Sequence, residues 1–152
     1  MSTNKKTESS LPLIGWREWV SLPDLGLRRI KAKIDTGART SSLHAFSIEA
    51  FETDHQTRRV RFMMHPIQKN EHMILQCEAD VIDERWVMDS GGHKELRYVI
   101  QTTLMINNQT WPIEVTLTNR DIMGLRMLLG RSAMKGRCII NPSRSFLTKN
   151  KR

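Results

Sequence analysis

The sequence predicts a mainly β protein, and three observations support that prediction. First, apolar residues recur at every second position in several stretches, which is typical of strands with one buried face. The clearest of these runs are Phe46/Ile48/Ala50, Val60/Phe62/Met64, Leu75/Cys77/Ala79/Val81 and Ile113/Val115/Leu117. Second, the pair Asn107-Asn108 can turn one strand into the next, because asparagine tolerates a left-handed backbone. Third, a single short helix is expected, over 132–135, with Gly136 just past its end.

The remaining elements follow in order along the chain. Besides the period-two runs, strands are expected near 14–20, 28–34, 99–106 and 111–117. A turn at 22–26, which contains proline and glycine, separates the first two of these strands. The stretch 45–88 is predicted to hold extra strands or a hairpin on one side of the fold.

The composition fits one folded domain. At 152 residues, with 39% hydrophobic residues, the chain can bury a sizeable core. We expect a disordered N-terminal arm over 1–12, a domain over 13–147 and a basic tail over 148–152. The start of the chain lacks the apolar core of a signal peptide, and no stretch reaches the roughly 18 apolar residues of a membrane helix. A cytoplasmic protein that does not act at a membrane is therefore expected.

The chain is basic, with 24 lysines and arginines against 16 acidic residues and a formal charge of +8. Such a charge can attract nucleic acid, ribosomes or acidic peptides over a long range. The basic residues are scattered, however, and the densest cluster in the expected domain, Arg58, Arg59 and Arg61, lacks interleaved surface aromatics. We interpret that cluster as a solvated strand face and predict no specific nucleic-acid site. Cys77 and Cys138 are expected to be free thiols, because two cysteines make no disulfide framework.

Two short segments far apart in the sequence carry the candidate chemistry. Asp35-Thr36-Gly37 gives a carboxylate at a strand end, a hydroxyl beside it and a glycine that lets another backbone pass close by. The same residues would also suit an ordinary turn in which the aspartate caps a loop. The second segment, Leu128-Leu129-Gly130-Arg131, offers two apolar residues and a glycine that can pack behind such a turn.

Together these segments resemble the active-site half of an aspartic peptidase. The strings AKIDTGARTSSLHA at 32–45 and MLLGR at 127–131 are similar to one bacterial and archaeal family, the retropepsin-like aspartic endopeptidases, often labelled ATP-dependent zinc proteases. The resemblance implies a closed acid-protease β-barrel with one short C-terminal helix, and hydrolysis of peptide bonds. Some members of that family are encoded beside ATP-grasp ligases that add glutamate to a ribosomal protein. Such a ligase or the ribosome is therefore an expected partner.

The resemblance assigns the catalytic role to Asp35, Thr36 and Gly37. Aspartic peptidases need two carboxyl groups that share a proton, and one Asp-Thr-Gly provides half of that pair. A symmetric homodimer, with Asp35 of each subunit meeting on the two-fold axis, supplies the other half. Thr36 is then expected to hydrogen-bond across the dimer and hold the two catalytic loops together.

Further residues are expected around the substrate. Ala38 leaves space for a peptide, and the segment Leu128-Leu129-Gly130-Arg131 supports the catalytic turn. Arg39 departs from the retroviral pattern, in which an aspartate at this position pairs with the arginine after the glycine. Because Arg39 and Arg131 are both positive, we expect each to find an acidic partner elsewhere or to remain solvated.

The segment Asp89-Ser90-Gly91-Gly92 is predicted to tip a hairpin that covers the substrate, as the flap of retropepsins does, and Ser90, Gly91 and Gly92 are expected to contact the peptide. A plain polar turn would look the same. A third interpretation is a second catalytic motif within one chain. Since the chain has one Leu-Leu-Gly segment and the spacing from Asp35 is too short for two lobes, the homodimer is favoured.

No cofactor and no metal site are expected. His65, His72 and Cys77 have no recognised zinc spacing, and His44 is interpreted as structural. The stretch 124–132 does not match a phosphate-binding loop. The sequence thus predicts an aspartic endopeptidase that acts on a peptide or protein substrate. The alternative is a non-catalytic binding or regulatory module of the same fold that acts with an ATP-grasp ligase or the ribosome.

Overall fold

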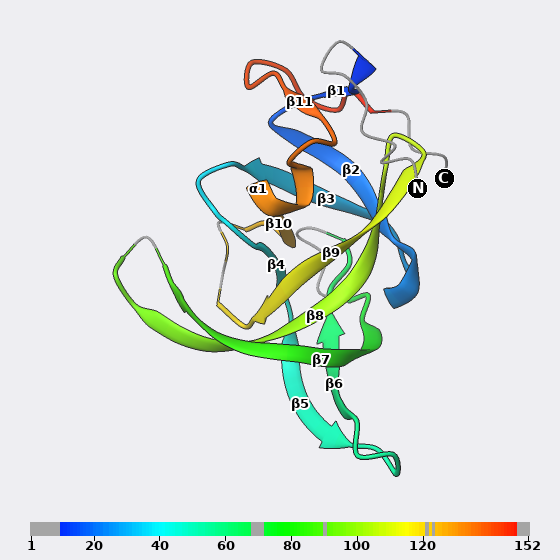
Figure 1. Ribbon diagram of the computed structural model, residues 1–152, viewed down its shortest axis with the longest axis vertical. Coiled ribbons are helices and arrows are strands. Elements are labelled where there is room, and N and C mark those ends of the chain that lie inside the picture. Colours follow the sequence, from blue (N-terminus) through cyan, green and yellow to red (C-terminus); the bar gives the residue numbers. More distant parts are fainter. Residues whose placement is uncertain (1–9, 68–71, 90, 121, 123, 149–152) are drawn as a thin grey trace.

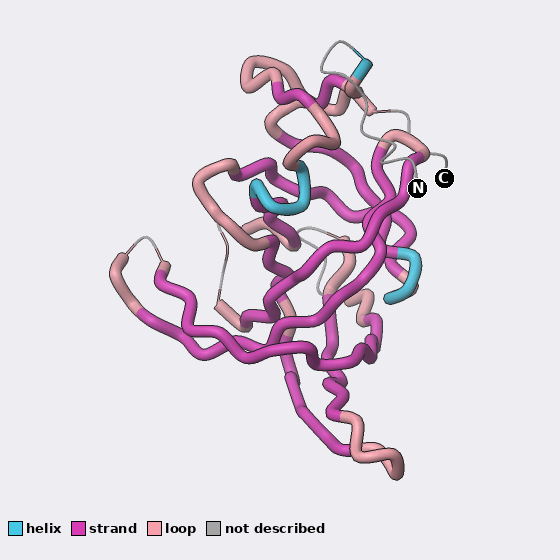
Figure 2. The backbone as a smooth tube through the Cα atoms, viewed as in Figure 1, coloured by secondary structure: helices cyan, strands magenta, loops and turns pink. Residues whose placement is uncertain are grey.

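Strands make up most of the structure, a computed structural model that describes residues 10–67, 72–89, 91–120, 122 and 124–148 (Figure 1). The strands are β1 (Leu13–Ile14), β2 (Arg17–Leu22), β3 (Leu27–Asp35), β4 (Ser41–His44), β5 (Phe46–Glu52), β6 (Arg58–Met64), β7 (Leu75–Met88), β8 (Lys94–Ile106), β9 (Gln109–Thr118), β10 (Met127–Gly130) and β11 (Ile139–Ile140). Figure 2 shows how little of the backbone is helical, with η2 (Pro23–Leu25) a 3-10 turn and α1 (Arg131–Met134) one turn of α-helix. The mainly β prediction with one short C-terminal helix is confirmed. None of the described helices is long and apolar enough to span a membrane.

A nine-stranded sheet dominates the fold, in the order β2-β3-β10-β4-β9-β8-β7-β6-β5. Strand β2 at one edge also pairs with β8 in the middle of the sheet, through Ser21 and Met105. The strands from β2 to β8 therefore form a ring. Within the described residues, β2 and β8 are paired through this one residue pair. The structure therefore shows a ring of strands that is closed at a single pair, rather than the fully hydrogen-bonded closed barrel that was expected.

The apolar core lies inside this ring and continues under β6. Many of its side chains have no solvent exposure, among them Val20, Leu22, Ile30, Leu43, Phe62, Met64, Ile100, Leu104 and Leu129. Burying each such side chain contributes about 1.5 to 3 kcal/mol relative to leaving it in water. The buried positions alternate along β6 and along the first part of β9, as the period-two pattern of the sequence predicts, whereas the last four residues of β9, 115–118, are all buried.

The expected strand near 14–20 is interrupted, which corrects the sequence-based prediction. A Cβ atom on Gly15 would lie 2.2 Å from the backbone oxygen of Arg144, so only glycine fits where the C-terminal segment passes. The backbone N–H of Trp16 donates to the same oxygen at 2.8 Å. As a result β1 leaves the large sheet and forms a separate parallel pair with β11.

The predicted turns and the additional strands are confirmed. Asn107 and Asn108 have φ values of 53° and 61°, and they connect β8 to β9. Gly26 has φ of 76° and follows the 3-10 turn that separates β2 from β3. The stretch 45–88 forms β5, β6 and β7, which extend the sheet in antiparallel fashion and project beyond the ring (Figure 1).

The C-terminal segment is attached to the ring by a buried carboxylate. Glu18 has no solvent exposure, and its oxygens accept hydrogen bonds from the backbone N–H groups of Gly15, Leu147 and Thr148 at 2.6, 2.9 and 3.1 Å. A buried carboxylate is tolerated only when its oxygens are satisfied in this way. The predicted arm over 1–12 and tail over 148–152 lie largely outside the described residues.

Candidate active site

The Asp35 turn lies at the end of β3, in the ring. The carboxylate oxygen Oδ1 of Asp35 accepts the backbone N–H of Gly37 at 3.0 Å, and the backbone oxygen of Asp35 accepts the N–H of Ala38 at 3.2 Å. A Cβ on Gly37 would lie 3.2 Å from that Oδ1. A side chain here would crowd the carboxylate of Asp35, whereas the sequence suggested that the glycine makes room for a passing backbone. Asp35 is half-buried, while Thr36 is exposed.

The strand β10 supports this turn from behind. It pairs with β3 in parallel, so that Leu129 lies opposite Ile34 and Gly130 opposite Asp35. A Cβ on Gly130 would lie 2.7 Å from the carbonyl carbon of Thr40 and 2.9 Å from the oxygen of Ala38. The N–H of Gly130 donates to the buried hydroxyl of Ser41 at 3.0 Å. The buried Leu129 and the half-buried Leu128 complete this support.

The start of α1 fixes the loop that follows Asp35. The N–H of Arg131 donates to the oxygen of Ala38 at 2.8 Å, and the hydroxyl of Ser132 donates to the oxygen of Arg39 at 2.6 Å. The guanidinium of Arg131 also lies 3.4 Å from the backbone oxygens of Thr36 and Gly37. The Asp35 turn is thus held by hydrogen bonds from the segment that the resemblance paired with it.

Arg131 is exposed and forms no ion pair with a carboxylate within the described residues, which is the solvated alternative of the two that were expected. Its guanidinium has planar donors that suit backbone carbonyls, and the turn presents two of them. Arg39 is exposed and forms no ion pair with a carboxylate in the part of the chain that the structure describes. Both positive charges therefore remain available at the surface of the site.

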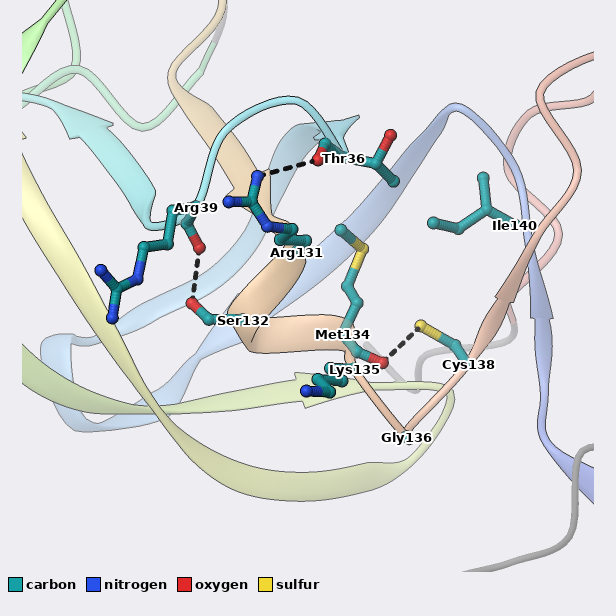
Figure 3. Close-up of a pocket in the computed structure, with 9 residues that line it drawn as sticks. All are labelled: Thr36, Arg39, Arg131, Ser132, Met134, Lys135, Gly136, Cys138 and Ile140. Atoms are coloured by element: carbon teal, nitrogen blue, oxygen red, sulfur yellow. Dashed lines mark hydrogen bonds between the residues drawn. The ribbon is translucent and has the colours of Figure 1, made fainter.

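A pocket of about 510 Å³ lies beside the turn. Its lining consists of Thr36, Arg39, Arg131, Ser132, Met134, Lys135, Gly136, Cys138 and Ile140. Figure 3 shows Arg131 lying between Thr36 and Arg39, with the sulfur atoms of Met134 and Cys138 on the side toward β11. Three of the lining residues are cationic and none is acidic, so the pocket favours negatively charged groups.

The predicted flap is the turn between β7 and β8, although Ser90 lies outside the described residues. Oδ1 of Asp89 accepts the N–H groups of Gly91 and His93 at 2.9 and 2.8 Å, and Gly92 has φ of 84°. The other carboxylate oxygen pairs with Arg120 at 3.0 Å. The hydrogen bond from His93 is the main cause of a lowered pKa of Asp89. Asp89 is thus engaged within its own turn and with Arg120, and within the described residues no hydrogen bond or ion pair connects it to the Asp35 turn.

A buried arginine connects the base of this hairpin to β4, the strand after the Asp35 turn. Arg97 is 6% exposed, and its Nη1 donates to the hydroxyls of Ser42 and Thr116 at 3.2 and 3.4 Å. Its Nε donates to Glu95 at 2.6 Å. Burial would raise the pKa of Glu95, but hydrogen bonds from Thr118 and Arg97 outweigh it and lower the pKa. This network was not predicted from the sequence, because Ser42, Arg97 and Thr116 are distant from one another in the chain.

The histidines and cysteines for which no metal role was predicted make ordinary packing and hydrogen-bonding contacts. His65 stacks on Phe46 with ring centroids 4.6 Å apart, and Nδ1 of His44 lies 3.3 Å from Arg126. Burial raises the pKa of the Cys77 thiol to about 11, and its sulfur lies 3.5 Å from the oxygen of Leu25. Within the described residues, no three His, Cys, Asp or Glu side chains gather as a metal site would require.

A strand-end Asp-Thr-Gly turn, with the glycine of an inner parallel strand opposite its aspartate, defines a protein of the retropepsin-like class. Residues 13–151 match the family model "RimB-like: Retropepsin-like aspartic endopeptidase RimB". The chain belongs to this RimB-like family.

Similar proteins fall into two groups. The chain is 49% identical over 133 residues to a "Probable alpha-L-glutamate ligase" of Parasynechococcus marenigrum (strain WH8102), covering 88% of this chain and 28% of that protein. It is 47% identical over 134 residues to a protein of the same name from Shewanella pealeana, covering 88% and 29%. The chain therefore spans less than a third of the length of these curated relatives. The crystal structure of Lpg0085 from Legionella pneumophila, a protein described as of unknown function, aligns with a TM-score of 0.72 at 27% identity over 91% of this chain and 98% of that one.

Proposed function

We propose that this protein is an aspartic endopeptidase whose active site forms between two copies of the chain. The observation that supports this proposal most strongly is the support of the Asp35 turn by Gly130, which presents a half-buried carboxylate at the edge of the ring. Gly37 holds Oδ1 of Asp35, while no hydrogen bond to Oδ2 is made by the described residues. That oxygen remains available for a water molecule or for a second carboxyl group.

The chemistry requires two Asp35 side chains in different protonation states. The ionised carboxylate takes a proton from a water molecule, whose oxygen attacks the carbonyl carbon of the peptide. The protonated partner donates its proton to the carbonyl oxygen, and the C–N bond breaks when the leaving nitrogen is protonated. Two carboxyls held this close share one proton, because both cannot be ionised together. Asp89 is a poor candidate for the second carboxyl, since its lowered pKa and its bond to Arg120 favour the ionised form.

The charges around the pocket support an acidic peptide as the substrate. Arg39, Arg131 and Lys135 line it, and the whole chain carries a formal charge of +8. Such a surface attracts carboxylates and raises their local concentration. The relatives' name refers to a ligase of α-L-glutamate, which agrees with a glutamate-rich chain as the peptide that this protein meets.

Cleavage of synthetic peptides tests the proposal. Glutamate-rich peptides and glutamine-substituted controls of equal length are incubated with the purified protein, and the products are identified by mass spectrometry. We expect hydrolysis of the acidic peptides by the wild type and none by Asp35→Asn. The matched control is Asp89→Asn, which removes the carboxyl charge from the other Asp-containing turn and should leave hydrolysis measurable. Hydrolysis that persists in pure Asp35→Asn protein would refute the assignment.

The second candidate function is a non-catalytic module that binds a glutamate ligase or the ribosome. It is favoured by one observation, namely that relatives named as ligases contain a matching segment that makes up 28% or 29% of their length. In that case the protein would bind a glutamate-rich peptide without cleaving it, and Asp35→Asn would leave the affinity unchanged. Calorimetry with the same peptides, followed by mass spectrometry of the recovered peptide, distinguishes the two functions.

A further inference from the structure

The outer face of the β2–β3 pair gathers basic residues that are separated in the sequence. In this antiparallel pair Arg17 lies opposite Lys33, and Trp19 opposite Lys31. Because side chains alternate along a strand, these residues share one face. Strands β2 and β3 run side by side in the ring, apart from β6, the strand that holds Arg58, Arg59 and Arg61 (Figure 1).

Aromatic rings lie among these cations. Trp19 and Phe146 stack with centroids 5.6 Å apart, and Phe146 is brought there by the C-terminal segment, whose N–H at this residue donates to the oxygen of Arg17. The guanidinium of Arg29 lies 4.1 Å from the centre of Trp19, and that of Arg17 lies 4.6 Å from Trp16. We call Trp16, Arg17, Trp19, Arg29, Lys31 and Phe146 the basic aromatic surface.

Among the described residues, no acidic side chain neutralises the positive charges of this surface. Within the described residues, none of Arg17, Arg29 and Lys31 forms an ion pair with a carboxylate, although each lies over an aromatic ring. Glu18, the one acidic residue of β2, is buried and binds the C-terminal segment instead.

The arginines of β6, Arg58, Arg59 and Arg61, differ from this surface, because each of them forms an ion pair. Arg58 pairs with Glu84, Arg59 with Asp80 at 2.6 Å and Arg61 with Glu78 at 3.1 Å. These partners lie on β7, the neighbouring strand, so the cluster carries little net charge. Of these two groups of basic residues, the basic aromatic surface is therefore the one whose positive charge has no acidic partner among the described residues.

We propose that the basic aromatic surface binds single-stranded nucleic acid. Uncompensated cations interleaved with aromatic rings are the combination that such ligands require, because phosphates pair with the cations and unstacked bases lie against the rings. Trp16 and Phe146 are each 37% exposed, so each offers part of a ring to a base. An acidic peptide would use the charges but would gain nothing from the rings. A duplex would present its phosphates while keeping its bases stacked away from them.

The affinity of the full chain for an oligonucleotide tests this proposal. The probe is a fluorescein-labelled oligouridine about 12 nucleotides long, which spans one site of this kind, and binding is followed by fluorescence anisotropy. Three phosphate contacts predict a slope of log affinity against log salt of about −2, so the affinity should fall roughly 20-fold between about 50 and 200 mM salt. A duplex of the same length should bind more weakly.

Matched variants separate this surface from the overall charge. Arg29→Gln with Lys31→Gln should reduce the affinity about tenfold or more at low salt and bring the slope to about −0.7. Arg59→Gln with Arg61→Gln removes the same amount of charge from the β6 arginines and should leave both the affinity and the salt slope unchanged. Phe146→Ala should cost about fivefold or more, whereas Phe146→Trp keeps a ring and should keep the affinity. Circular dichroism and thermal unfolding identify any variant that fails to fold. If Phe146→Ala does not fold, the affinity of Phe146→Trp still tests whether an aromatic ring at this position is enough for binding.

Three results would overturn the proposal. One is an equal loss of affinity in both Gln pairs, which would mean that net charge alone attracts the probe. Another is unchanged binding by Phe146→Ala in a folded protein, which would exclude stacking. The third is displacement of the oligouridine by poly-glutamate of equal charge at equal concentration, which would make the surface a peptide site.

Discussion

Gly130 lies directly opposite Asp35 in the parallel β3–β10 pair, at a position where no side chain fits. The space that a Cβ would need is taken by the backbone of Thr40 and by the oxygen of Ala38. The backbone that follows Asp35 is therefore packed against the one residue of β10 that lacks a side chain. Any group added at Gly130 has to move the loop that carries the site.

Gly130→Ala is expected to destabilise the protein by about 3 kcal/mol, because the added methyl group meets backbone atoms that cannot rotate away. Urea denaturation, followed by circular dichroism, measures this loss. The matched control is Gly136→Asn, a position with open space and φ of 75° that asparagine tolerates, where a change below about 1 kcal/mol is expected. If Gly130→Ala were as stable as wild type, the loop that holds Ala38 and Thr40 would have to move at no cost in free energy, which the close packing at Gly130 argues against.

Activity is expected to depend on self-association, because each chain offers one Asp-Thr-Gly turn. Specific activity should fall on dilution into the range where sedimentation shows monomers. Mixing wild type with a threefold excess of Asp35→Asn should leave roughly a quarter of the activity per wild-type chain, since most pairs then hold one carboxyl. Constant specific activity among demonstrable monomers would exclude the pair of Asp35 side chains.

Hydrolysis is expected to survive a strong chelator, because the proposed nucleophile is a water activated by a carboxylate. Activity is compared before and after dialysis against the chelator, with a zinc-dependent peptidase as the positive control for metal removal. Loss of activity that zinc restores would contradict this mechanism. Attention would then turn to His65, His72 and Cys77, although the raised pKa of Cys77 disfavours its thiolate.

The β7–β8 hairpin is expected to loosen in acid. In the folded protein the pKa values of Asp89 and Glu95 are lowered from 3.8 and 4.5. A carboxyl with a lowered folded pKa stabilises the fold above its unfolded pKa and loses that contribution as pH falls through the folded value. Protection of the hairpin amides should therefore be complete above about pH 5 and should decrease below about pH 4.

Hydrogen exchange, corrected for the pH dependence of the intrinsic rate, measures this change. In Glu95→Gln the protection of the hairpin amides should change less steeply with pH, because one of the two titrating carboxyl groups is removed. Amide protection that increases on acidification would mean that protonation of these carboxyls stabilises the hairpin, which is the opposite sign.

Local patterns in the sequence predict the strands and turns well, whereas contacts between distant residues limit the rest. Alternation along β6 and the Asn107-Asn108 pair each depend on neighbours in the chain, and both predictions are confirmed. The interruption at Gly15 depends on Arg144, which only the folded chain brings close. The same reason explains why the support of Asp35 was recognised by resemblance to a family rather than from local residues.

The network around Arg97 and the basic aromatic surface show the same limit. Arg97 stands in an ordinary strand sequence, and its partners Ser42 and Thr116 come from two other strands. The sequence marked Arg58, Arg59 and Arg61 as the densest cluster, yet strand pairing neutralises those residues. Proximity in the chain therefore does not show which of these charges are neutralised, because that depends on the acidic residues of the neighbouring strand.

The additional strands end in β5, which has β6 as its one neighbour in the sheet. An edge strand exposes unpaired backbone groups and can recruit another β-strand, which leads to aggregation. In β5 the pairing register shifts between Phe46 and Glu49, and Ser47 adopts φ of 51°, so the edge is bent where a foreign strand would have to align. Glu49 and Glu52 add like charges along it. The irregularity of β5 thus disfavours pairing of this edge with a strand of another molecule, which is the step that would lead to aggregation.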